Sequence, residues 1–143
     1  MMELDFDDDL LTGLRGYVRL VTRELGLTGE CSYVHDEPAG AYLALDGRLP
    51  GFPDRDVALV WDESSGWSVA VETHSGEDLI VYAYFGPEVL PAPEAVARWV
   101  HGLLRGERRI TSWPGARQQS HEDLVRRVAP YAAALLVPAP RNP

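Results

Sequence analysis

The chain of 143 residues contains a single cysteine, no lysine and no long apolar run. Cys31 has no second cysteine to pair with, so neither an internal disulfide nor a cysteine-rich zinc site can form. A membrane helix needs roughly 18 apolar residues in a row, and this stretch is absent, so we expect no membrane partner. The first residues are acidic where a secretory signal is basic, and we therefore expect a cytoplasmic protein.

Signatures of the common enzyme classes are missing as well. The sequence has no P-loop, no G-x-G-x-x-G, no G-x-S-x-G and no histidine pair at metal-ligand spacing. Cys31 and His35 fall in one expected strand, where they lie roughly 13 Å apart, too far for a thiol–imidazole pair. We therefore assign no catalytic residue, no metal and no cofactor, and favour a protein that is not an enzyme.

Charge is unevenly distributed along the chain, whose formal net charge is −9. Residues 1–90 carry 18 acids and 5 arginines, whereas residues 91–143 carry 4 acids and 8 arginines. An acidic protein repels nucleic-acid backbones, which disfavours a nucleic-acid partner. The basic segment Arg105–Arg117 is expected to be a solvated loop. Two alternatives remain: it binds a nucleic acid, or it binds an anionic protein surface such as the acidic sheet of a second copy.

The hydrophobic pattern predicts an α+β domain with an N-terminal helix, a five-stranded antiparallel meander and two C-terminal helices packed on one face. The first helix is expected over Asp8–Leu25, where apolar residues recur at spacings of three and four. The connections between the strands are too short for helices, so the sheet is antiparallel. The expected strands are Cys31–Asp36, Ala41–Leu45, Val57–Asp62, Trp67–Glu72 and Leu79–Phe85.

The second helix is expected over Pro93–Arg105, because proline suits a first helical turn. The third follows Ser120, and Pro130 is expected to split or kink it near Ala129. We expect one domain over residues 10–137, with a flexible acidic segment before it and a flexible proline-rich tail, residues 138–143, after it.

Apolar residues alternate in the third and fourth strands, which predicts a shared face under the helices. A three-residue loop ending at a left-handed Gly66 places Leu59 opposite Val71. The same register places Trp61 opposite Val69.

The fifth strand is apolar on both faces. A two-residue turn at Ser75-Gly76 pairs Val71 with Ile80 and Val69 with Tyr82. The expected core face is Ile80, Tyr82 and Tyr84, and the expected opposite face is Leu79, Val81, Ala83 and Phe85. An apolar second face often marks an association surface, so a homodimer through this strand is a specific prediction.

Binding candidates come from the aromatic and charged residues around the sheet. They are Asp54, Arg55, Trp61, Trp67, Tyr82, Arg108 and Arg109. The tryptophans either pack against a helix or form the floor of a partner site, because tryptophan is enriched in binding hot spots. The alternative to an interaction module is a small-molecule-binding protein or an enzyme with an unfamiliar pocket between the sheet and the first helix. The expected pocket walls are Tyr17, Trp61, Trp67 and Tyr82.

Three strings carry a resemblance to a family. LPGFPDRD, the WDE…GW turn and the VLPAP-to-helix junction resemble small actinobacterial proteins classed as a domain of unknown function, over roughly residues 12–103. The resemblance implies an actinobacterial, cytoplasmic protein and brings no activity, cofactor or site residue. We therefore expect a non-enzymatic interaction or regulatory module, with an unknown protein or a second copy as partner.

Overall fold

A computed structural model of the chain describes residues 6–27, 32–36, 39–73, 78–107 and 121–136. Its elements confirm the predicted order of one helix, five strands and further helices. They are α1 (Phe6–Glu24), β1 (Ser32–Asp36), β2 (Ala39–Leu45), β3 (Val57–Asp62), β4 (Gly66–Glu72), β5 (Leu79–Tyr84), α2 (Pro93–Leu104), α3 (His121–Val128) and the 3-10 helix η2 (Ala129–Leu135).

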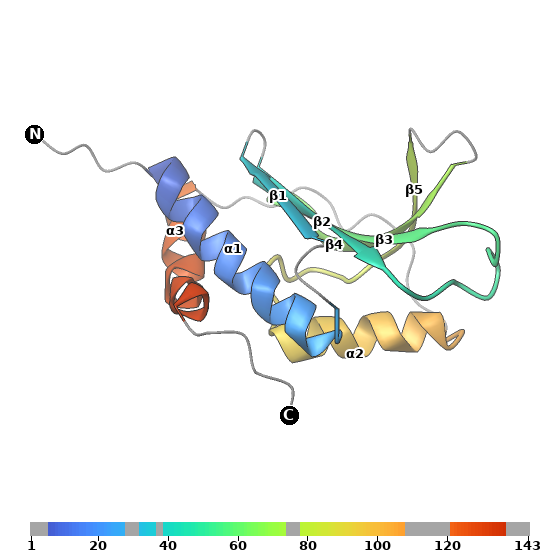
Figure 1. Cartoon of the computed structure of the whole chain (residues 1–143). Coiled ribbons are helices and arrows are strands. Elements are labelled where there is room, and N and C mark those ends of the chain that lie inside the picture. The colour runs from blue at the N-terminus through green and yellow to red at the C-terminus, as the bar shows by residue number, and fades with distance from the viewer. Residues whose placement is uncertain (1–5, 28–31, 37–38, 74–77, 108–120, 137–143) are drawn as a thin grey trace, which may run out of the picture.

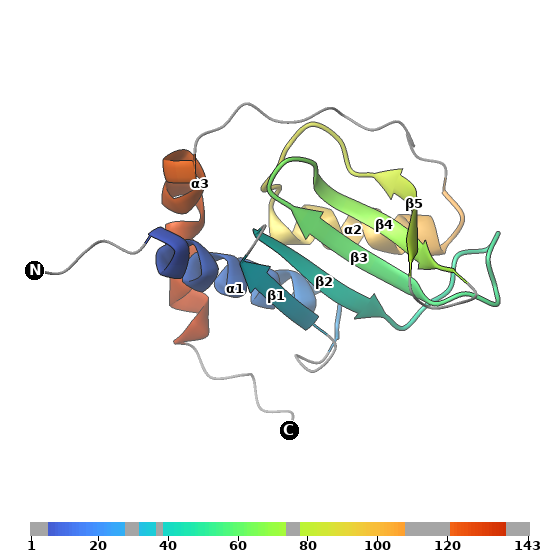
Figure 2. The ribbon, with the colours of Figure 1, turned by 90° about the horizontal axis from the view of Figure 1, so that it is seen from above.

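The five strands form one antiparallel sheet in the order β1-β2-β3-β4-β5, which is the predicted meander. The helices α1 and α2 lie on one face of this sheet, and α3 packs against α1 at the end of the molecule (Figure 1). Seen from above in Figure 2, the strands lie over α2, and no described helix covers their other face. We term that other side the outer face.

The helix boundaries have local causes. The apolar stripe of α1 is buried at Leu10, Leu14, Tyr17, Val18 and Val21. Gly26 ends this helix with a φ of 74°, and the N–H of Leu27 reaches back to the carbonyl of Thr22 at 3.0 Å. The predicted split of the third helix is confirmed, because α3 ends at Val128 and η2 begins at Ala129.

The core lies between the helices and the inner face of the sheet. Leu59, Trp61, Trp67 and Val69 are each at most 1% exposed, which confirms that the odd positions of β3 and β4 share the buried face. The predicted pairing of these strands was wrong by two residues: Leu59 pairs with Val69, and Trp61 pairs with Trp67. Since the shift is even, every side chain keeps its predicted face.

The side chain of Asp62 explains the different register. One carboxylate oxygen accepts hydrogen bonds from the backbone N–H groups of Ser64, at 2.9 Å, and Ser65, at 2.7 Å. These bonds close the loop one residue earlier, so Gly66 pairs with Asp62 instead of belonging to the loop. Gly66 has the predicted left-handed conformation, with a φ of 74°.

The β4–β5 pairing is confirmed at Val71–Ile80 and wrong beyond it. A bulge between Val69 and Ala70 places Ala83, not Tyr82, opposite Val69. Ala83 is therefore buried on the core face, contrary to prediction. The predicted faces of Phe85 and Tyr84 were also wrong. Phe85 lies on the inner side, where its ring stacks on Trp99 of α2 with ring centroids 4.8 Å apart, and Tyr84 pairs with Ser68 of the outer face. The predicted turn at Ser75-Gly76 lies outside the described residues.

Candidate functional site

The two tryptophans proposed as binding residues are core residues in the structure. Trp61 is 0% exposed and Trp67 is 1% exposed, as expected if they pack against a helix. The indole N–H of Trp61 donates to the Val89 carbonyl at 2.7 Å, and that of Trp67 donates to the Tyr17 hydroxyl at 3.0 Å. Their polar atoms are therefore satisfied within the protein, which leaves the predicted pocket between the sheet and α1 without support from these residues.

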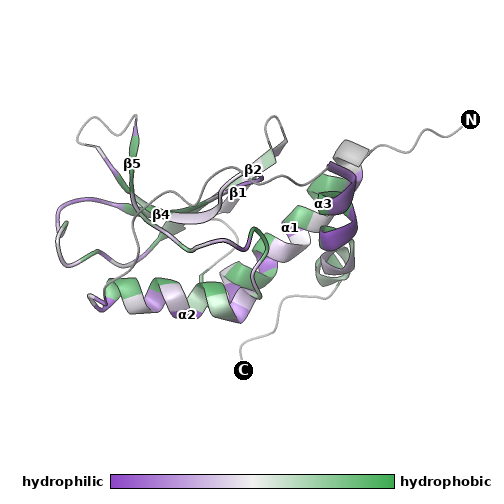
Figure 3. Cartoon of the chain, turned by 180° about the vertical axis from the view of Figure 1, so that it is seen from behind, coloured by the Kyte–Doolittle hydropathy of each residue, from purple (hydrophilic) through white to green (hydrophobic). Residues whose placement is uncertain are grey.

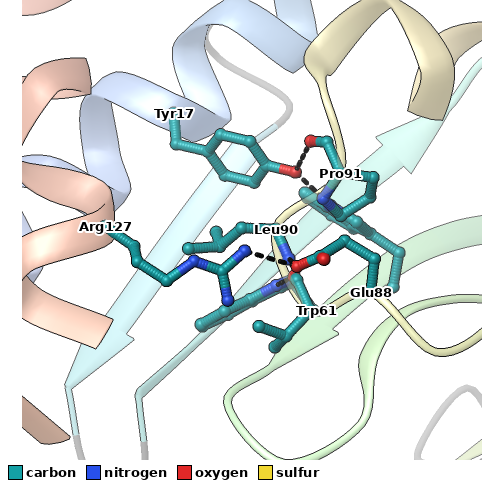
Figure 4. Close-up of polar contacts among 8 residues, drawn as sticks. Tyr17, Trp61, Glu88, Leu90, Pro91 and Arg127 are labelled. Carbon is teal, nitrogen blue, oxygen red and sulfur yellow. Dashed lines mark hydrogen bonds and ion pairs between the residues drawn. The ribbon is translucent and has the colours of Figure 1, made fainter. Parts of the chain in front are cut away.

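These bonds fasten the connector, residues 85–92, which runs from β5 to α2. The Tyr17 hydroxyl donates to the Pro91 carbonyl, beside the Trp61 bond to Val89 (Figure 4). Burial is the main cause that raises the pKa of Tyr17 above its usual range, so the phenol stays protonated and donates. The cluster of Tyr17, Trp61 and Trp67 therefore has a structural role, because its hydrogen bonds hold the connector against the core.

The connector is also tied to α3 by an ion pair. The Glu88 carboxylate accepts a hydrogen bond from the Arg127 guanidinium, and the same oxygen accepts from the Leu90 N–H at 3.1 Å (Figure 4). These contacts lower the pKa of Glu88, with the Arg127 bond as the largest cause. Because Arg127 comes from the C-terminal helix, this pair joins parts of the chain far apart in sequence.

The loop before β3 carries the charged binding candidates. Asp54 is exposed, whereas Arg55 is half-buried and donates to the Glu72 carbonyl at 3.3 Å. Tyr82 is half-buried, with its ring edge-to-face on Phe52, 5.9 Å between centroids. Asp54, Arg55 and Tyr82 therefore lie around the β4–β5 end of the sheet, apart from the buried tryptophans. Arg108 and Arg109 lie outside the described residues.

A polar contact that the sequence did not indicate crosses the outer face. The Tyr42 hydroxyl of β2 donates to the Glu72 carboxylate of β4 at 2.9 Å. Their strands are separated by β3, and the register places the small residue Ala58 between them. Burial and this bond raise the pKa of Tyr42 to about 12, so its proton is held rather than available for transfer. Finding this contact from sequence requires the register of three strands.

The most exposed apolar residues of the sheet lie on β5. Leu79, Ile80 and Val81 are 40%, 53% and 41% exposed. They are consecutive, they belong to an edge strand, and β5 rises away from the helices that cover the rest of the inner face (Figure 1). Figure 3 shows β5 as a largely apolar strand. Leu79 and Val81 belong to the predicted apolar surface, whereas Ile80 was predicted on the core face and its exposure was not foreseen.

The two edges of the sheet differ in chemistry. β5 has the sequence LIVYAY and no charged residue, whereas β1 has the sequence SYVHD and ends at Asp36. Natural proteins protect sheet edges with charges, prolines or bulges, because a free edge pairs with other strands. On β5 the bulge is the only such device within the strand, and it leaves Leu79–Val81 regular.

The described part of the chain has neither a metal-binding cluster nor a membrane-spanning helix. No three His, Cys, Asp or Glu residues there lie close enough together to hold a metal ion. No helix in the same residues is both long and apolar enough to cross a membrane.

Comparison with known proteins gives one match. Residues 17–102, more than half of the chain, match the model of a family of unknown function, DUF6292. This span runs from the middle of α1 to α2 and includes the whole sheet. No curated protein and no solved structure matches the chain.

Proposed function

The chain belongs to the DUF6292 family, whose function is unknown, and we propose that it is a non-enzymatic protein-interaction module that works through strand β5. The observation that carries this proposal is the consecutive exposure of Leu79, Ile80 and Val81 on an uncharged edge strand. Exposed apolar surface costs free energy in water, and association recovers it. A second copy of the chain is the partner that we favour.

Charge supports self-association at this strand more than elsewhere. Two copies that each carry a net charge of −9 repel one another wherever charged surfaces meet. The six residues of β5 carry no charge, so contact there brings no like charges directly together. By contrast, the loop before β3 carries the acids Asp46, Asp54 and Asp56.

Two parts of the proposal concern the source and location of the protein. The complete replacement of lysine by arginine agrees with an actinobacterial, GC-rich genome. A cytoplasmic location is the other part of the proposal.

Sedimentation equilibrium over a wide concentration range tests the proposal. We expect the wild-type chain to show a reversible monomer–dimer equilibrium and Ile80→Lys to remain monomeric. Tyr33→Lys on β1 is the matched control, because Tyr33 is 63% exposed on the opposite edge and the change of charge is the same. A wild-type chain that is monomeric at every concentration would exclude self-association through β5.

A further inference from the structure

We propose that two copies of the chain join by antiparallel strand addition, β5 to β5, with Ile80 on the two-fold axis. This inference rests on the proposed function, because it specifies how the β5 surface associates. It also differs from a simple contact of apolar side chains, because the backbone of β5 forms the bonds.

The backbone groups available for this pairing follow from the β4–β5 ladder. The N–H of Thr73 donates to the carbonyl of Asp78 at 3.0 Å, so the backbone groups of Asp78 face β4. Inward and outward groups alternate along an antiparallel strand. Ile80 therefore also faces β4, whereas the N–H and C=O groups of Leu79 and Val81 face away from the sheet.

The segment Leu79–Val81 can therefore pair with the same segment of a second copy, because its first and last residues have free backbone groups and its middle residue does not. In a two-fold pairing centred on Ile80, Leu79 of one copy lies opposite Val81 of the other, and the reverse. Each of these two pairs exchanges two hydrogen bonds, so the short strand forms four. The two Ile80 residues then face one another as a non-hydrogen-bonded pair, with Cα atoms about 4.5 Å apart.

The bulge restricts the register to this one. Centring the pairing on Val81 sets Leu79 opposite Ala83, whose backbone faces β4 after the bulge, so the ladder is interrupted. Centring it on Leu79 uses Val81 but requires a partner before Asp78, outside β5. Only the register centred on Ile80 places both outward residues of the regular segment in hydrogen-bonded pairs.

Side chains and charges agree with this register. The exposed Leu79 and Val81 side chains meet across the junction on one face, and the exposed Ile80 side chains meet on the other. Asp78 lies opposite the uncharged Tyr82 of the second copy. The two Asp78 carboxylates are then about four positions, or roughly 13 Å, apart along the strands, which exceeds the Debye length of about 8 Å at physiological ionic strength.

Proline substitution tests backbone pairing directly. Val81→Pro removes an N–H that faces away from β4, so the monomer keeps its ladder while the dimer loses two of its four hydrogen bonds. We expect the association constant of the dimer, measured by sedimentation equilibrium, to fall roughly tenfold or more. Val81→Ala is the matched control, because it shortens the side chain and keeps the N–H; we expect it to retain most of the association.

The outcomes separate this inference from the proposed function. If Ile80→Lys abolishes association while Val81→Pro behaves like Val81→Ala, side chains of β5 associate and strand addition is wrong. If Ile80→Lys associates like the wild-type chain, or the wild-type chain is monomeric, self-association through β5 is wrong and strand addition fails with it. Leu79→Pro provides a second test if Val81→Pro does not fold, because it also removes an outward N–H and lies at the first position of the strand.

Discussion

Gly16 of α1 lies directly against the backbone of Tyr131 in η2. A Cβ atom at Gly16 would sit 1.8 Å from the Tyr131 carbonyl oxygen, and one at Gly13 would sit 2.6 Å from that of Val128. The two glycines therefore form the surface on which the C-terminal helices pack. Gly13, Gly16 and both of their partners lie outside the family match, residues 17–102, so the match does not cover this packing.

Replacement of Gly16 by alanine should destabilise the protein. In an exposed helix the change stabilises by up to about 1 kcal/mol, so the propensity alone predicts a gain. Here the new methyl group meets backbone atoms, and we expect a net loss of about 2 kcal/mol in the free energy of unfolding. Urea denaturation measures it, with the exposed neighbour Arg15→Ala as a control that should change stability by less than about 0.5 kcal/mol. An increase in stability for Gly16→Ala would contradict the observed contact.

Tyr42→Phe should destabilise the protein by about 1 kcal/mol at pH 7, because it removes the hydrogen bond to Glu72. The difference should depend on pH. The pKa of Tyr42 is about 12 in the folded chain and about 10 in the unfolded chain, so between these values only the unfolded state loses the proton. The stabilisation is therefore complete below pH 10 and is lost as the pH rises towards 12.

Chemical denaturation of both chains at several pH values from 8 to about 11.5 checks this prediction. The gap between the wild-type chain and Tyr42→Phe should narrow as the pH rises above 10. Tyr17, whose pKa is also raised, is present in both chains and does not affect the difference. If the difference in stability between the two chains stays constant over this range, Tyr42 has the same pKa in the folded and unfolded states, and the prediction is wrong.

Glu88→Gln should weaken the link between the connector and α3. The pair with Arg127 is partly exposed, so we expect a loss of less than about 1 kcal/mol at pH 7. The pKa of Glu88 is lowered in the folded chain, so its stabilisation is present above the unfolded value near 4.5 and disappears as the pH falls through the folded value. A double-mutant cycle with Arg127→Gln, repeated at pH 7 and at low pH, isolates the coupling. Equal coupling at both pH values would contradict the proposed role of the carboxylate.

Salt should strengthen self-association. The β5 contact is uncharged while each copy carries a net charge of −9, so screening removes repulsion without weakening the contact. We expect the association constant of the dimer to rise as the NaCl concentration increases from about 20 to 300 mM. Association that weakens with salt would instead favour the alternative in which the basic segment Arg105–Arg117 binds the acidic sheet of another copy.

The sequence predicted the elements well because their signals are local. The period of the apolar residues fixed α1, and Pro130 located the junction between α3 and η2. The left-handed Gly66 and the buried face of β3 and β4 also follow from short-range patterns. The strand β5 was recognisable as a surface because it is apolar on both faces.

The errors came from contacts that short-range patterns do not encode. Two three-residue loops, residues 63–65 and 64–66, place the same side chains on the buried face, so the hydrophobic pattern does not distinguish them. The hydrogen bonds of the Asp62 carboxylate favour the first loop. The bulge between Val69 and Ala70 leaves Tyr82 without a partner in the ladder, and it exchanged the faces of Ala83 and Tyr84. Trp61 and Trp67 were binding candidates because tryptophan is enriched in binding hot spots. Their hydrogen-bond partners, Val89 and Tyr17, lie far from them in sequence, so no short-range pattern indicated that both indoles are satisfied in the core.

Amide hydrogen exchange of β5 at low and high protein concentration tests the β5 pairing most directly. The amides of Leu79 and Val81 face away from β4 and should exchange freely in the monomer, then become protected as dimer forms. The amide of Ile80 already bonds within the sheet and should change far less, which provides an internal control. Slower exchange at Leu79 and Val81 with rising concentration is the expected result. Unchanged exchange at both residues while sedimentation shows a dimer would contradict strand addition, and unchanged exchange without a dimer would contradict association through β5.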